Sequence, residues 1–157
     1  MKISPKNILW PTDFSALSLK AARYARAFRE QFGGTLHVIH VVPPPLAPDV
    51  SVILPAEVPI AVTEPELLDA SRRGLERVVA EQFGKTAGVQ MEVFYGTPWM
   101  GVCDYAKRSA IDLLVIATHG RTGLGHVLIG STAERIVQHA PCPVLTVKES
   151  EQDFVAG

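Results

Sequence analysis

The stretch that most strongly indicates the fold is "IDLLVIAT", residues 111–118, the most hydrophobic of several short apolar runs. It leads directly into a glycine-rich passage, "HGRTGLGHVLIG", residues 119–130. Short apolar runs that end at turn residues are typical of strands covered on both faces of a parallel sheet. We therefore predict a buried parallel strand here, followed by a loop of unusual composition.

Helical and strand patterns alternate along the rest of the chain. The predicted strands are residues 8–10, 35–42, 89–96, 111–118 and 142–148, and the apolar stretches between them have helical spacing. This order predicts a doubly wound α/β fold: a five-strand parallel sheet with helices on both faces, right-handed crossovers and strand order 3-2-1-4-5. The signals for helix ends are Ser15, Gly33-Gly34, Thr97-Pro98, and the capping-box spacings Thr63–Glu66 and Ser131–Glu134.

Length and composition favour one globular domain. The chain has 157 residues, of which 47% are hydrophobic, and a formal net charge of −1. This charge does not indicate the positively charged surface that is typical of nucleic-acid-binding proteins. No run is long enough to span a bilayer, and no signal peptide is evident, so we expect a cytoplasmic protein without a membrane partner. The two cysteines, Cys103 and Cys142, are expected to be small buried residues. We assign residues 1–148 to a single domain and residues 149–157 to a loose C-terminal tail.

Residues 43–62 form a proline-rich excursion that cannot be a regular helix. Its apolar side chains at Val50, Val52, Ile53 and Leu54 indicate that it packs on something. A lid over the site and a part of a dimer interface are both compatible with this pattern.

Two strand ends carry polar, turn-forming residues. Pro11-Thr12-Asp13 follows the first strand, and Thr118-His119-Gly120 follows the fourth. In open parallel sheets, ligands bind at the carboxyl ends of the strands where the strand order reverses. With the order 3-2-1-4-5, these two segments face each other across one crevice.

The glycines of residues 119–130 are suited to binding an anion. Gly120, Gly123, Gly125 and Gly130 let backbone N–H groups approach a phosphate, and Gly130 precedes a helix start, where free N–H groups attract it. Three known motifs do not fit. A Walker A loop would need lysine where Ser131 stands, a dinucleotide fingerprint is absent after the first strand, and no G-x-S-x-G elbow occurs.

The two ends of the chain resemble the universal stress protein family, of the ATP-binding UspA-like type. The residues that carry the resemblance are "ILWPTDFSALSLKAARYA" and "THGRTGLGHVLIGSTAERIVQHAPCPVLTVK". The resemblance implies an adenine nucleotide alpha hydrolase-like fold and the motif G-x2-G-x9-G-(S/T). Gly120 and Gly130-Ser131 match this motif, whereas Ala117 replaces its first glycine.

The resemblance also implies roles for individual residues. Pro11, Thr12 and Asp13 would line the pocket near adenine and ribose, and Val41 would offer its backbone to the adenine edge. Ala117, His119 and Gly120 would follow the ribose and α-phosphate, with Arg121 and Gly123 in the same loop, and Gly130, Ser131 and Thr132 would bind the outer phosphates. Mg²⁺ would accompany ATP, held mostly by phosphate oxygens and water. Homodimerisation through the last strand, Val144–Val147, is also implied.

Several residues have a plainer alternative role. Asp13 is equally suited to cap the first helix, and Ser131 is expected to cap the helix that it opens. Arg121 is either a phosphate partner or a solvated loop charge, His119 is a ligand neighbour or a turn residue, and His126 has the weaker case. His37 and His40 are interpreted as packing or hydrogen-bonding residues on one face of the second strand.

Three classes of function remain open from the sequence. The first is a regulatory protein that binds an adenine nucleotide with at most slow hydrolysis, the second is an ATPase, and the third is a dimeric interaction protein with a vestigial site. Efficient phosphoryl transfer needs cationic charge on the γ-phosphate and a positioned base, and this passage contains no lysine. We therefore favour binding over turnover and name no catalytic residue and no metal ligand.

Overall fold

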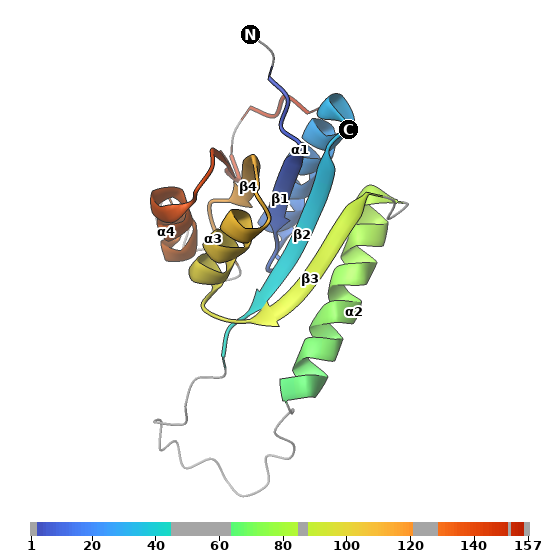
Figure 1. The fold of residues 1–157 in the computed structure, drawn as a ribbon, viewed down its shortest axis with the longest axis vertical. Helices are drawn as coiled ribbons and strands as arrows, with labels where there is room; N and C mark the ends of the chain where they lie inside the picture. Colours follow the sequence, from blue (N-terminus) through green and yellow to red (C-terminus); the bar gives the residue numbers. More distant parts are fainter. Residues whose placement is uncertain (1–2, 45–63, 85–87, 121–128, 151, 156–157) are drawn as a thin grey trace, which may run out of the picture.

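The predicted sheet is confirmed in a computed structural model, which describes residues 3–44, 64–84, 88–120, 129–150 and 152–155 (Figure 1). Five strands lie in the order β3-β2-β1-β4-β5, and every neighbouring pair is parallel. The strands are β1 (Asn7–Pro11), β2 (Thr35–Val42), β3 (Val89–Tyr95), β4 (Leu113–Ala117) and β5 (Val144–Val147). The helices are α1 (Ala16–Phe32), α2 (Glu64–Phe83), α3 (Pro98–Arg108) and α4 (Ser131–His139).

The helices cover the two faces of the sheet in pairs. Helices α1 and α2 pack on one face and α3 and α4 on the other, so the molecule has three layers (Figure 1). Side chains alternate between the two faces along each strand. On β2, Val38 and Val42 belong to the core under α1 and α2, and Ile39 and Val41 belong to the core under α3 and α4.

The central strand β1 is deeply buried, because strands flank it on both sides and helices cover both faces. Ile8, Leu9 and Trp10 have no exposed surface. The Trp10 indole N–H donates to the Ser18 carbonyl at 3.1 Å, and its ring lies 5.6 Å from that of Phe83 on α2. Trp10 therefore connects the sheet to both helices of this face, immediately before the chain leaves β1.

The first helix begins and ends as the sequence predicts. Ser15 is the N-cap, and its side-chain oxygen accepts the Ser18 N–H at 3.2 Å. Gly33 ends the helix in the left-handed conformation with φ 68°, and its N–H donates to the Arg29 carbonyl. A side chain at that φ would be strained, which is why glycine is favoured there.

The predicted cap of the last helix is wrong by one residue. Gly130, with φ −75° and ψ 155°, is the N-cap of α4, and Ser131 is already helical without any side-chain capping bond. The reason is that Gly130 is held from outside the helix, where its N–H donates to the Thr118 carbonyl at 2.7 Å. The Gly130 carbonyl in turn accepts the Glu134 N–H at 2.9 Å.

The predicted common face for His37 and His40 is also wrong. The two residues are three positions apart, and in a strand an odd separation places side chains on opposite faces. His37 contacts Tyr105 of α3, and His40 contacts Phe14 on the face of α1 and α2.

The C-terminal residues contact α1, so the part of the tail that the structure describes is not loose. One guanidinium N–H of Arg23 donates a hydrogen bond to the Asp153 carboxylate, and another donates to the Val155 carbonyl, both at 2.8 Å. The Phe154 ring lies edge-on against Tyr24, with centroids 5.0 Å apart. These contacts hold residues 153–155 along the outside of the helix.

Candidate functional site

A cavity of about 640 Å³ opens at the carboxyl ends of β1, β2 and β4, where the strand order reverses. This volume lies within the range of about 300–1,000 Å³ that is typical of small-molecule sites. Ten of the twelve predicted binding residues line it: Pro11, Thr12, Asp13, Val41, Ala117, His119, Gly120, Gly130, Ser131 and Thr132. The other two, Arg121 and Gly123, lie outside the described residues, as do His126 and most of the proline-rich excursion.

Thr12 holds the turn after β1 in a fixed shape. Its N–H donates to the Ile39 carbonyl at 2.9 Å, and its own carbonyl lies 2.7 Å from Nδ1 of His40. The Thr12 hydroxyl oxygen accepts the Phe14 N–H at 3.0 Å and lies 2.9 Å from the Ser18 hydroxyl. Four hydrogen bonds thus fix a residue that is only 5% exposed, and they set the direction of Asp13 beside it.

Asp13 does not cap the first helix, because Ser15 occupies that position. Its Oδ1 accepts the Ser15 N–H at 3.0 Å, which closes a turn ahead of α1. Its Oδ2 lies against Gly120, at the place where a side chain on that residue would begin. A Cβ on Gly120 would therefore require the Asp13 carboxylate to shift from this position.

Both described ends of the loop after β4 line the same cavity. The Gly130–Thr118 hydrogen bond closes this loop, and a Cβ on Gly130 would lie 3.3 Å from the Thr118 carbonyl oxygen. The first turn of α4 follows, and its residues Ser131, Thr132 and Ala133 line the cavity. N–H groups of a first helical turn have no intrahelical acceptor, and the helix dipole adds partial positive charge, so this end is suited to an anion.

One wall of the cavity, on the same side of the sheet as the start of α4, is apolar. Its side chains come from β2, α3, β4 and α4, on the face that α3 and α4 cover, and include Val41, Val102, Ile116 and Ile136. An apolar wall beside a helix N-terminus suits a ligand that has a flat, weakly polar group at one end and negative charge at the other.

The sequence reasoning missed a group of lining residues on the other face of the sheet. Phe14 has φ 65°, which is uncommon for a bulky residue, and its ring lies 4.4 Å from the His40 ring. Leu67 and Ser71 reach the cavity from α2. The sequence did indicate that His40 could line the cavity, because it lies two residues before Val42, the end of β2. No sequence feature indicated that residues of α2 would also line it.

Among the described lining residues, Asp13 is the one carboxylate, and none is lysine or arginine. Within the described ranges, no group of three His, Cys, Asp or Glu side chains lies close enough to hold a metal ion. A divalent cation would fit here as a partner of ligand phosphates, with Asp13 as the one carboxylate among the described lining residues. The arrangement supplies binding groups rather than a nucleophile paired with a base.

The surroundings of the two cysteine thiols lower their reactivity. Cys103 is buried and Cys142 is half-buried. Burial raises the pKa of both, and the neighbouring carboxylates Asp104 and Asp112 raise it further for Cys103 and Cys142 respectively. Both thiols are thereby kept protonated and poorly nucleophilic.

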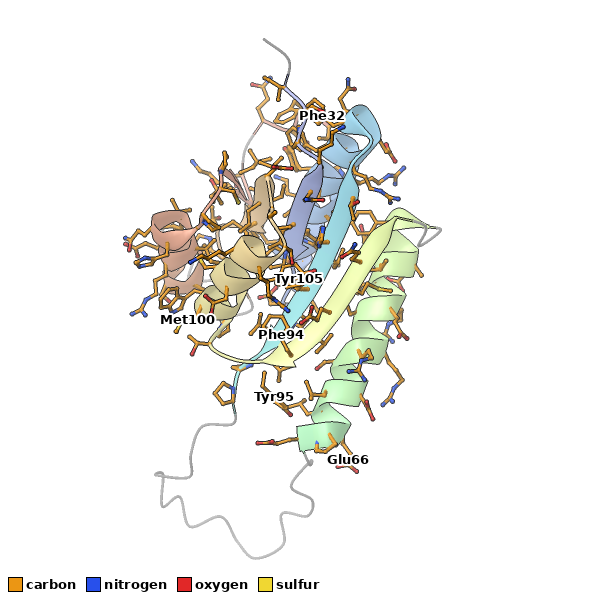
Figure 2. All side chains as sticks on the ribbon, viewed as in Figure 1. Phe32, Glu66, Phe94, Tyr95, Met100 and Tyr105 are labelled. Carbon is orange, nitrogen blue, oxygen red and sulfur yellow. The ribbon has the colours of Figure 1, made fainter. Side chains whose placement is uncertain are left out.

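His37 is a buried histidine outside the cavity. It is 4% exposed, its Nδ1 lies 2.9 Å from the Tyr105 hydroxyl, and its Nε2 has no hydrogen-bond partner within the described part of the chain. Figure 2 shows Tyr105 of α3 beside Phe94 of β3, and the two rings stack with centroids 6.5 Å apart. Burial lowers the pKa of His37 below its ordinary value of 6.5.

This lowered pKa predicts a loss of stability in mild acid. As the pH falls below about 6.5, the unfolded chain takes up a proton at His37 that the folded chain does not, so the free energy of unfolding decreases until the lower folded-state pKa is reached. Urea unfolding at about pH 7.5 and pH 5.5 measures the decrease. We expect His37→Leu to show a smaller decrease than the parent protein; an equal decrease in both would exclude His37 as a cause.

The class of protein follows from comparison with known proteins. The model of the universal stress protein family matches residues 5–148, and the chain belongs to this family. Universal stress protein MJ0531 of Methanocaldococcus jannaschii is 36% identical over 152 residues, which cover 94% of this chain and 85% of that protein.

Solved structures agree with the fold. Universal stress protein UspA from Lactobacillus plantarum has a TM-score of 0.72 and 28% identity, covering 93% of this chain and 99% of that one. A universal stress protein in complex with cAMP has a TM-score of 0.65 and 18% identity, covering 94% of this chain and 100% of that one, and at this identity it shows the fold alone. No helix in the described ranges is long and apolar enough to cross a membrane.

Proposed function

We propose that this universal stress protein binds ATP, or another adenine nucleotide, in the cavity at the carboxyl ends of β1, β2 and β4. The observation that carries the proposal is the convergence of two distant segments. The turn at Thr12 and Asp13 and the start of α4 at Gly130 line one cavity, although more than a hundred residues separate them. The complex of a related fold with cAMP supports the same class of ligand.

In this proposal the phosphates lie at the first turn of α4 and the base lies against the apolar wall at Val41 and Ile116. The helix end supplies unpaired N–H donors for the phosphates. Mg²⁺ enters with the nucleotide, coordinated by phosphate oxygens and water. A site that stabilises the ground state and the transition state equally does not accelerate ATP hydrolysis. The proposed role is therefore regulatory nucleotide binding in the cytoplasm during a stress response, with slow hydrolysis at most.

Calorimetric titration of the purified protein with Mg-ATP tests this function. We expect saturable binding at one nucleotide per chain, and weaker binding of Mg-GTP, whose base carries different hydrogen-bonding groups on its edge. If neither nucleotide produces a saturable signal, the cavity is not a nucleotide site. A steady release of phosphate during the titration would instead favour the ATPase alternative.

We also propose that the protein forms a homodimer through β5, the edge strand at Val144–Val147. The Pro143 carbonyl accepts the N–H of Leu114 in β4 at 3.0 Å, and the Val147 carbonyl accepts the N–H of Thr118, just after β4, at 2.9 Å. Alternate residues of a strand direct their N–H and C=O groups to opposite sides, so those of Val144 and Thr146 point away from β4. Among the strands of the described ranges, none pairs with this side of β5, and a second copy of the chain is proposed to pair there.

The dimer proposal predicts that Thr146→Pro produces a folded monomer. Proline removes an N–H that points away from β4, so the sheet within the chain keeps its hydrogen bonds while pairing across the edge loses one and meets the proline ring. Sedimentation-velocity centrifugation measures the mass of each species. If the parent protein is already a monomer, or if Thr146→Pro remains a dimer, the interface is elsewhere.

A further inference from the structure

Val41 lies both in the wall of the cavity and at the contact between β2 and α3. It is 7% exposed and belongs to the core under α3 and α4. Pro98 and Val102 of α3 line the same cavity, and residues four positions apart share one face of a helix. The shape of this apolar wall therefore depends on how closely α3 approaches Val41.

Gly101, in the second turn of α3, lies at the closest part of this contact. A Cβ on Gly101 would lie 3.0 and 3.1 Å from the two methyl carbons of Val41, and 2.9 Å from Cε2 of Phe94. Ordinary van der Waals contacts of a Cβ lie at 3.4–4 Å, so three atoms are too close to leave room for one methyl group. The helix can pack on β2 at this distance because position 101 has no side chain.

The Phe94 ring is held by contacts of its own. It stacks on Tyr105 with centroids 6.5 Å apart and an interplanar angle of 8°, and the Arg108 guanidinium lies 5.6 Å from its centroid. Figure 2 shows Phe94 and Tyr105 side by side between β3 and α3. A methyl group on Gly101 would therefore disturb this stack, move Val41, or push α3 outward. The last two changes alter the wall of the cavity directly.

A second glycine, Gly96, also adjoins Val41 and provides a contrast. It follows β3, and its N–H donates to the Val42 carbonyl at 3.0 Å. A Cβ on Gly96 would lie 3.6 Å from Cγ1 of Val41, which is an ordinary contact, and Gly96 does not have a positive φ. Alanine therefore fits at Gly96 but not at Gly101, although both would touch the same methyl carbon.

We propose, on the basis of the nucleotide function above, that Gly101 is a positioning residue of the nucleotide site and acts through Val41. Without a side chain at position 101, α3 comes close enough to β2 for Val41, Pro98 and Val102 to form one wall. The nucleoside lies against this wall. A methyl group at position 101 changes the wall and weakens the nucleoside contact without touching the ligand itself.

Gly101→Ala tests this role by calorimetric titration with Mg-ATP. The variant is expected to bind ATP about 10-fold less tightly than the parent protein, because overpacking at this contact displaces the wall. Alanine is also the better helix former, which offsets the crowding, so the temperature of thermal unfolding is expected to stay within about 4 °C of the parent value. A merely structural role would lower stability together with affinity.

Two comparisons control the result. Gly96→Ala adds a methyl group beside the same side chain and is expected to keep ATP affinity within about twofold of the parent value. Val41→Ala weakens ATP binding by itself but removes both crowded methyl groups. Adding Gly101→Ala to Val41→Ala is therefore expected to change affinity by less than about threefold further. This last comparison still decides the question if Gly101→Ala alone does not fold.

Each other outcome overturns the proposal. Unchanged ATP affinity in Gly101→Ala, or an equal loss in Gly96→Ala, means that the approach of α3 at Gly101 does not position the site. A further loss of about 10-fold on adding Gly101→Ala to Val41→Ala means that Gly101 does not act through Val41. If the parent protein binds ATP and one of these results is found, only this inference fails. If the parent protein does not bind ATP, the nucleotide function fails and this inference fails with it.

Discussion

Gly120→Val is expected to weaken Mg-ATP binding by at least about 100-fold, equivalent to roughly 2.7 kcal/mol. The Oδ2 of Asp13 occupies the position at which a side chain on Gly120 would begin. A shift of Asp13 would break the hydrogen bond that its Oδ1 accepts from the Ser15 N–H at 3.0 Å. Valine therefore forces the carboxylate, the glycine loop or both out of the cavity. Calorimetric titration of the variant measures the loss of affinity.

The control for this substitution is Asp13→Ala combined with Gly120→Ala. With the carboxylate removed, the Cβ introduced by Gly120→Ala has room, so the double variant is expected to unfold at a temperature closer to that of the parent protein than Gly120→Ala alone. An unchanged ATP affinity in Gly120→Val would mean that neither Asp13 nor this loop contacts the nucleotide.

Trp10→Ala is expected to lower the free energy of unfolding by about 3–5 kcal/mol. Trp10 has no exposed surface, and its indole packs against Phe83 and donates to the Ser18 carbonyl. Removing it leaves a cavity beside the central strand and deletes the hydrogen bond that the indole donates to the Ser18 carbonyl. Since domains of this size have a total stability of about 5–15 kcal/mol, the loss is a large fraction of the whole. Urea unfolding followed by far-UV circular dichroism measures it without relying on tryptophan fluorescence.

The second tryptophan of the chain provides the matched comparison. Trp99 is half-buried, and its ring lies 5.1 Å from the His139 ring and 5.4 Å from the Arg135 guanidinium, both on α4. Trp99→Ala removes these contacts near the surface and is expected to lower the free energy of unfolding by less than half as much. Similar losses in the two variants would contradict the central role given to Trp10.

The fold could be predicted because the local signals agree with one another. The apolar runs at residues 8–10 and 111–118 are continuous, as strands covered on both faces must be, and alternation with helices leaves few topologies. The ends of α1 followed from Ser15 and Gly33, whose chemistry is local. The N-cap of α4 at Gly130 could not be predicted from the local sequence, because it depends on a hydrogen bond to Thr118 across the loop.

Only the lining residues on one side of the cavity could be predicted from the sequence. The residues named from the sequence belong to strand ends and glycine turns, which a parallel sheet brings to one edge. The other side depends on how α2 packs against Phe14, and neither the positive φ of Phe14 nor the approach of Ser71 has a signature in the local sequence. The face of His40 could have been predicted correctly from its odd separation from His37.

The most direct test of nucleotide binding is to denature freshly purified protein and identify the released nucleotide by chromatography, with its amount per chain. The proposed function predicts an adenine nucleotide at a stoichiometry approaching one, or full occupancy at that ratio once Mg-ATP is added. No released nucleotide, followed by no calorimetric binding of added Mg-ATP, would contradict the assignment of this cavity as a nucleotide site.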